Sequence, residues 1–169
     1  MAERLSKDEL ARRLSALAPR MAPGAERVEN LVRLTGGASM ETWAFDAVGE
    51  GEAKTPLILR RRTRMVMNSA VSKPPLRREA EAIALAVEAG VPAPIVTYVC
   101  DEEADGLDEA YVMHRVAGET LGKKITSDPA FEPARGKLAR QCGAALARIH
   151  SVAPLDGLDQ TDAETTLAN

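Results

Sequence analysis

The sequence is poor in the residue types that build metal sites, disulfide frameworks and base-stacking surfaces. Its 169 residues include two cysteines and two histidines, and aromatic residues make up 3% of the chain. Cys100 and Cys142 lack CxxC spacing and have no His/Cys cluster beside them, which argues against a zinc site and against a redox pair. We therefore predict no metal ligands, and we expect each cysteine to be a small, buried, apolar residue.

Long apolar runs are also missing. No run of apolar residues reaches the ~18 that a membrane span requires, and the N-terminal MAERLSKDEL has no apolar signal core. The net charge of -3 and the scarcity of aromatic residues argue against a general nucleic-acid binder and against binding to anionic membranes. These features predict a soluble, cytoplasmic chain whose partners are neither nucleic acid nor membrane.

Charged residues are abundant but unevenly distributed. A segment without acids, residues 57–78, contains the cations Arg60, Arg61, Arg62, Arg64, Lys73, Arg77 and Arg78. A later segment, residues 101–109, contains the acids Asp101, Glu102, Glu103, Asp105, Asp108 and Glu109. Such segregation suggests a local anion site, although a charged run is more often a solvated face. Arg60 directly follows three large aliphatic residues, and an arginine at the end of an apolar strand usually needs an anionic partner.

Hydrophobic spacing predicts an α+β fold. Alternation with a period of two predicts five strands, near residues 28–34, 41–48, 57–62, 95–100 and 110–116. Helical spacing predicts an N-terminal helix from a Ser6–Glu9 capping box to Pro19, and further helices over residues 77–89 and 133–150. Short turns between the strands imply an antiparallel sheet, with the 77–89 helix packed on one face. Residues 63–75 have no clear period and two prolines, so we predict a mobile connection there.

Several features of this predicted sheet suit a phosphate-bearing ligand. The Gly36-Gly37-Ala38-Ser39 turn could offer backbone amides to phosphate oxygens, although a Gly-Gly hairpin is usually only a hairpin. Strand alternation places Ile58 and Arg60 on one face, which puts an apolar surface beside a cation. Glu79 could pair with Arg60 from the neighbouring helix, or it could belong to an ordinary Arg/Glu surface.

In their order and spacing, these features resemble the aminoglycoside phosphotransferase/choline kinase-like family, whose fold is related to protein kinases. The resemblance covers roughly residues 28–158, and the arginine after Leu59, in place of lysine, is most similar to the branch found next to acyl-CoA dehydrogenases. The motifs are Leu34-Thr-Gly-Gly-Ala-Ser39, Leu57-Ile-Leu-Arg-Arg61, Leu76-Arg-Arg-Glu-Ala80, Gly90-Val-Pro-Ala-Pro94, Tyr111-Val-Met-His-Arg-Val-Ala-Gly118 and Ala145-Leu-Ala-Arg-Ile-His150.

The resemblance implies ATP as the ligand and a role for each matching position. Gly36, Gly37, Ala38 and Ser39 would cover the phosphates. Arg60 would contact the α- and β-phosphates with Glu79 as its helix partner. The backbone of His114 and Val116 would meet adenine, Met113 would guard the pocket behind it, and Ile58 would pack on the base.

The family's catalytic loop, HGD-x4-N, and its later metal-binding Asp motif do not occur in this sequence. His150 is followed by Ser151 and is not the catalytic-loop histidine, so we predict no catalytic residue, and we expect Mg²⁺ only with the missing C-terminal lobe. The phosphate acceptor stays open among aminoglycoside, choline, homoserine and other hydroxyl compounds.

The predicted organisation is an N-terminal helical segment (1–24), a kinase-like nucleotide-binding lobe (25–118), a hinge with the first helix of the C-terminal lobe (119–158) and a polar tail (159–169). The predicted function is the nucleotide-binding N-terminal portion of an ATP-dependent small-molecule phosphotransferase that is inactive alone. Its partners would be nucleotide, the missing lobe of its own protein and, through the exposed lobe interface, a second copy. The alternative is a non-catalytic, kinase-like binding module.

Overall fold

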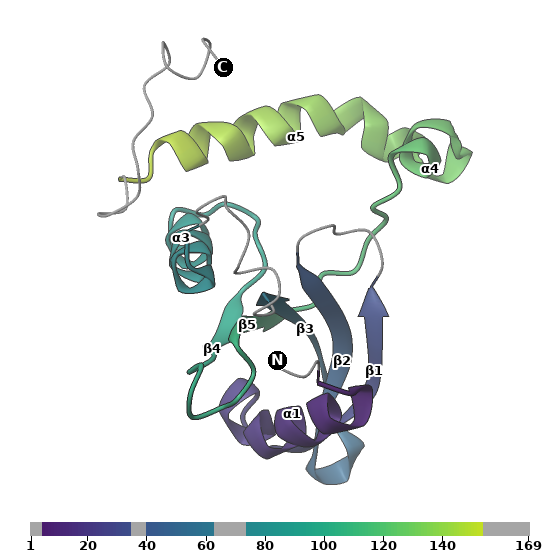
Figure 1. The fold of residues 1–169 in the computed structure, drawn as a ribbon. Helices are drawn as coiled ribbons and strands as arrows, with labels where there is room; N and C mark the ends of the chain where they lie inside the picture. The colour runs from purple at the N-terminus through teal and green to yellow at the C-terminus, as the bar shows by residue number, and fades with distance from the viewer. Residues whose placement is uncertain (1–4, 35–39, 63–73, 154–169) are drawn as a thin grey trace.

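The computed structural model describes residues 5–34, 40–62 and 74–153, which form an antiparallel sheet with helices on both faces (Figure 1). The sheet order is β1-β2-β3-β5-β4, and all neighbouring strands are antiparallel. The predicted five-stranded α+β fold is thus confirmed, and it is consistent with a kinase-like N-terminal lobe. The strands are β1 (Ala25–Leu34), β2 (Glu41–Gly49), β3 (Lys54–Arg62), β4 (Val96–Val99) and β5 (Glu109–His114). The helices are α1 (Lys7–Met21), η1 (Glu50–Glu52), α3 (Leu76–Glu88), α4 (Gly122–Ser127), η2 (Pro129–Phe131) and α5 (Glu132–His150).

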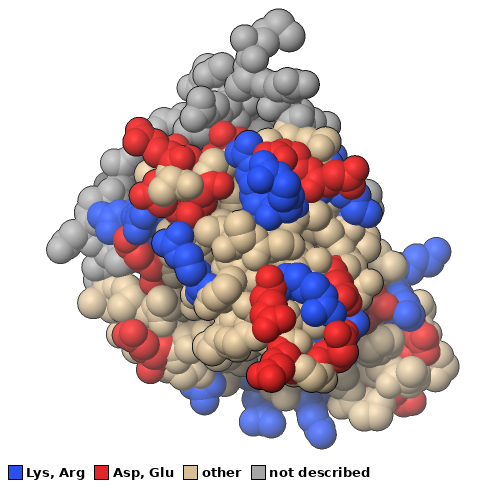
Figure 2. Space-filling view, turned by 90° about the horizontal axis from the view of Figure 1, so that it is seen from below, with Lys and Arg blue, Asp and Glu red and all other residues tan. Residues whose placement is uncertain are grey.

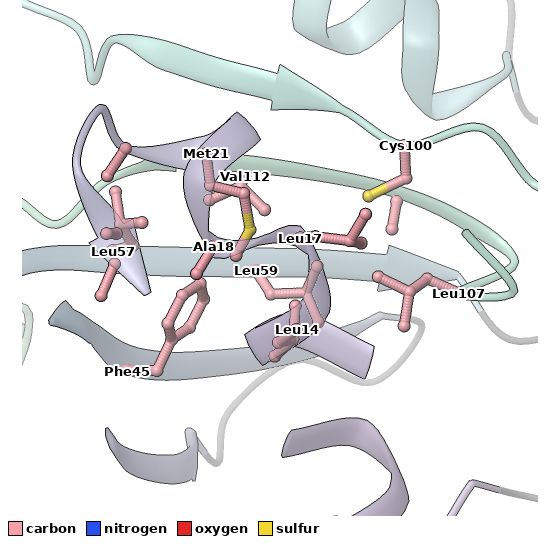
Figure 3. Packing of buried hydrophobic residues seen from close by; sticks show 14 of the residues in the cluster. Leu14, Leu17, Ala18, Met21, Phe45, Leu57, Leu59, Cys100, Leu107 and Val112 are labelled. Carbon is pink, nitrogen blue, oxygen red and sulfur yellow. The ribbon is translucent and has the colours of Figure 1, made fainter. Parts of the chain in front are cut away.

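The larger core lies between α1 and one face of the sheet. The apolar stripe of α1 meets side chains from β2, β3 and β5, among them Phe45, Leu57 and Val112, all fully buried (Figure 3). Burial of such side chains from water is the main term that holds the helix to the sheet. Leu57 and Leu59 both belong to this core and therefore share one face of β3, as strand alternation predicted.

The smaller core lies on the opposite face, under α3. Leu76 and Ala80 of α3 pack on Tyr111 of β5, and all three are buried. Tyr111 points away from the α1 side because its neighbours Ala110 and Val112 belong to the larger core. The face that carries Ile58 and Arg60 is thus the α3 face.

The structure corrects the predicted end of the first helix. Helix α1 begins after the Ser6 cap, whose hydroxyl accepts a hydrogen bond from the Glu9 amide, but it continues through Pro19 to Met21. Proline removes one hydrogen bond of a helix interior and crowds the preceding turn. The helix continues nevertheless, because Ala18 and Met21 are buried in the larger core and packing there outweighs that cost.

The structure also corrects two expectations near the C-terminal end of the described residues. Strand β5 ends at His114, so Val116 lies outside it and is 69% exposed. Helix α5 buries none of its residues, and Cys142 is exposed, whereas Cys100 is buried as predicted. An amphipathic pattern identifies the apolar side of a helix but not what covers it, and here no described element covers it.

Charges on the surface are largely mixed. On the face shown in Figure 2, Lys and Arg side chains lie beside Asp and Glu side chains without an extended area of one sign. Ion pairs also join opposite charges near the β2–β3 turn: Arg27 contacts Glu52 at 2.8 Å, and Lys54 contacts Glu29 at 3.1 Å. Within the described ranges, none of the helices is long and apolar enough to cross a lipid bilayer.

Candidate functional site

The candidate site is built around Arg60 on β3 and Glu79 on α3. Arg60 Nε lies 2.7 Å from Glu79 Oε1, so the contact predicted from the sequence is confirmed. Each side chain is about one-third exposed, 33% for Arg60 and 34% for Glu79. The pair lies at the surface of the smaller core, where solvent screens it only in part.

The guanidinium of Arg60 is held from one side. Its Nε atom is buried and forms no aligned hydrogen bond, so its contact with Glu79 is that of opposite charges. In the described part of the chain, no hydrogen bond engages the terminal nitrogens Nη1 and Nη2 of Arg60. Those two nitrogens carry four of the five guanidinium N–H donors, and they suit the oxygens of a phosphate or carboxylate.

Tyr111 is the neighbour of the Arg60–Glu79 pair that sequence reasoning missed. Its hydroxyl donates a hydrogen bond of 2.9 Å to Glu79 Oε1, the same oxygen that faces Arg60. Tyr111 is the register partner of Arg60 on the adjacent strand, so both side chains leave the sheet toward α3. Burial raises the pKa of the Tyr111 phenol, and the Glu79 carboxylate raises it further, so the hydroxyl stays protonated. The pairing of β3 with β5, which the structure supplies, puts residues 60 and 111 side by side.

The apolar side of the site follows from the same strand pairing. Ile58 is buried, and it pairs in register with Met113, which is half-buried next to the smaller core. These two residues and Arg60 lie on one face of two adjacent strands. The structure therefore brings together the predicted base-packing, gatekeeping and phosphate-binding positions, while their roles stay predictions.

Backbone hydrogen bonds hold the end of β5 and the residue that follows it. The His114 amide donates to the Ile95 carbonyl at 2.9 Å, and the Arg115 amide donates to the Pro56 carbonyl at 3.0 Å. The His114 amide is therefore already engaged. Val116 follows and is exposed.

The two arginines that follow Arg60 on β3 form ion pairs of their own. Arg61 points to the α1 face, where its side chain is 4% exposed and contacts Asp108 at 2.7 Å and Glu41 at 3.2 Å. Arg62 contacts Glu109 at 2.8 Å and donates to the Pro74 carbonyl at 2.9 Å. Arg61 and Arg62 thus pair with acids of the 101–109 segment across the β3–β5 pair, whereas Arg60 contacts Glu79 of α3.

Three further observations bound the site. Gly36, Gly37, Ala38 and Ser39 lie outside the described residues, as does most of the predicted mobile connection, residues 63–73. A hollow of about 390 Å³ lies beside the start of α3, and none of the predicted site residues lines it. Across residues 5–34, 40–62 and 74–153, no group of three or more His, Cys, Asp or Glu side chains is arranged to hold a metal ion.

Comparison with known proteins identifies the family. The sequence model of the phosphotransferase enzyme family matches residues 30–168, from within β1 to beyond α5. The chain belongs to this family. A comparison with curated proteins finds no match. Membership confirms the predicted likeness to aminoglycoside phosphotransferases and assigns the chain to phosphotransferases in general, and the match includes every residue of the candidate site.

Proposed function

We propose that this phosphotransferase-family chain binds ATP across the α3 face of β3 and β5, as the nucleotide-binding lobe of a kinase that transfers phosphate to a hydroxyl compound. The observation that carries the proposal is the 2.7 Å contact between Arg60 and Glu79, which holds the guanidinium while its terminal nitrogens stay available. A cation held in this way suits the α- and β-phosphates of a nucleotide.

The neighbouring residues suit the rest of the nucleotide. Ile58 and Met113 supply apolar surface for the base, beside the cation. The His114 carbonyl and the Val116 backbone would meet the hydrogen-bonding edge of adenine, and Gly36–Ser39 would cover the phosphates. Arg60 in place of lysine is also the ground on which we propose the branch associated with acyl-CoA dehydrogenases.

We further propose that these residues bind nucleotide without turning it over by themselves. Phosphoryl transfer needs a carboxylate at the base position and metal-binding Asn and Asp side chains. The corresponding HGD-x4-N motif does not occur in the 169 residues. Without bridging Mg²⁺, contacts to adenine and two phosphates should give an affinity in roughly the high-micromolar range or weaker.

The test of this proposal combines a binding titration with a turnover assay. An NMR titration of the 169-residue chain with ATP should shift the signals of Ile58, Arg60, Met113 and Val116, and incubation with a panel of hydroxyl acceptors should consume no ATP. Absence of binding would favour a non-catalytic interaction module. Turnover that survives purification controls would reveal an acid/base group among these residues.

A further inference from the structure

A single carboxylate oxygen joins three elements of the lobe. Glu79 Oε1, on α3, lies 2.7 Å from Arg60 Nε on β3 and accepts a hydrogen bond of 2.9 Å from the Tyr111 hydroxyl on β5. The Tyr111 residue is only 1% exposed, so its hydroxyl is a fixed donor inside the smaller core. Glu79 itself lies at the surface, with 34% of its side chain exposed.

The ion pair alone is a weak restraint on Glu79. Partly exposed Arg/Glu pairs contribute little by themselves, because water screens the charges and two long side chains must be held in one geometry. A buried donor changes this, since a hydrogen bond to a charged acceptor is stronger than one between neutral groups. A carboxylate held by Tyr111 can in turn fix the Nε side of the guanidinium.

We propose that Tyr111 is a positioning residue: its hydroxyl holds Glu79 so that Arg60 presents its terminal nitrogens to the nucleotide phosphates. The inference rests on the proposed function, because Arg60 must meet phosphate for the positioning to matter. Burial and the neighbouring carboxylate both raise the pKa of Tyr111, so the donor proton stays in place throughout the neutral range.

The chain contains a matched control. Tyr98 on β4 is the other tyrosine, and its hydroxyl donates a 2.7 Å hydrogen bond to the carboxylate of Asp105. Tyr98 packs against the larger core on the α1 side, away from α3. Tyr98→Phe therefore removes a carboxylate-bound hydroxyl of the same kind without touching the Arg60–Glu79 pair.

The first experiment is a double-mutant cycle on ATP affinity. Tyr111→Phe keeps the ring in the core and should weaken ATP binding by roughly 3- to 10-fold, while Tyr98→Phe should leave it unchanged. In an Arg60→Ala background, Tyr111→Phe should have no further effect, because the positioned group is gone. An equal loss in both backgrounds, or no loss in either, overturns the inference.

The second measurement needs no nucleotide. The Arg60 Nε–H signal in ¹⁵N NMR should exchange with water faster in Tyr111→Phe and in Glu79→Gln, while that of Arg27, which is paired with Glu29, stays constant. An unchanged Arg60 signal overturns the positioning role whether or not ATP binds. If the Arg60 signal exchanges faster in the variants but the wild type does not bind ATP, Tyr111 still positions Arg60. In that case the link between Arg60 and phosphate, and the proposed function with it, would be wrong.

Discussion

At the residue scale, three consecutive arginines of β3 make different contacts. Arg61 is buried between carboxylates on the α1 face, and Arg62 forms an ion pair with Glu109. Among the ion pairs of the described residues, Arg60 contacts only Glu79. Alternation along β3 separates Arg61 from its neighbours, and the pairing with β5 supplies the partners. The composition of the basic segment alone could not make that distinction.

The two tyrosines give a residue-scale prediction about pH. Burial is the main cause that raises the pKa of both Tyr98 and Tyr111, and a hydrogen-bonded carboxylate adds to it in each case. The unfolded chain loses these protons near pH 10, whereas the folded chain keeps them. The resulting stability is fully present below about pH 10 and is lost as the pH rises above it.

Spectrophotometric titration checks this prediction, because the chain has no other tyrosine. Tyrosinate absorbance should stay low near pH 10 and should appear at higher pH together with the loss of the circular dichroism signal. Tyr111→Phe should reduce the fall in stability across the alkaline range. A tyrosinate signal that titrates near pH 10 while the chain is still folded would contradict the account.

At the element scale, the loop between β4 and β5 is fastened to α1. The Asp105 side chain is 1% exposed; it accepts hydrogen bonds from the Tyr98 hydroxyl at 2.7 Å and the Asp101 amide at 2.8 Å. Arg20 of α1 contacts Asp105 at 3.1 Å, and its guanidinium lies over the Tyr98 ring. Arg13 of α1 also donates to the Gly106 carbonyl.

Replacing Asp105 tests that connection. Asp105→Ala should destabilise the fold by about 1–3 kcal/mol, because the half-buried Tyr98 hydroxyl and the Asp101 amide lose their acceptor. Glu102→Ala, an exposed change in the same loop, should stay within about 0.5 kcal/mol of the wild type. Denaturant unfolding measures both variants, and equal stability of the two would refute the role of Asp105.

Prediction from sequence succeeded where the information was local. In the described part of the chain, the five strands and the three long helices follow from residue spacing, whereas α4 and the two short 3-10 helices were not predicted. The face shared by Ile58 and Arg60 follows from alternation. Tyr111 was missed because its contact with Glu79 depends on the β3–β5 register, which joins residues far apart in the chain. The burial expected for Cys142 was wrong because the apolar side of a helix does not specify its cover.

At the scale of the whole molecule, α5 stands apart from the lobe core (Figure 1). Its large apolar residues Leu138, Leu146 and Ile149 are 46%, 51% and 47% exposed and recur at helical spacing. Exposed apolar stripes of this kind are normally covered by another surface. We expect the 169-residue chain to associate with itself through this face.

Sedimentation velocity under reducing conditions should therefore show a mass that increases with protein concentration. The double variant Leu138→Lys and Leu146→Lys should shift the chain toward monomer, since a charge in an apolar interface is costly. Arg27→Ala, a surface change near the β2–β3 turn, is the control and should associate like the wild type. A clean monomer at high concentration would contradict the expectation.

The central claim is that Arg60, held by Glu79, meets the phosphates of a nucleotide. The most direct test compares the affinities of ATP and adenosine for the wild type, for Arg60→Ala and for the surface control Arg27→Ala, by NMR titration. Arg60→Ala should weaken ATP binding by roughly tenfold, the lower range for a hydrogen bond to a charged group, and should leave adenosine affinity unchanged. Arg27→Ala should change neither. If a folded Arg60→Ala variant binds ATP as tightly as the wild type, the link between this arginine and phosphate is wrong.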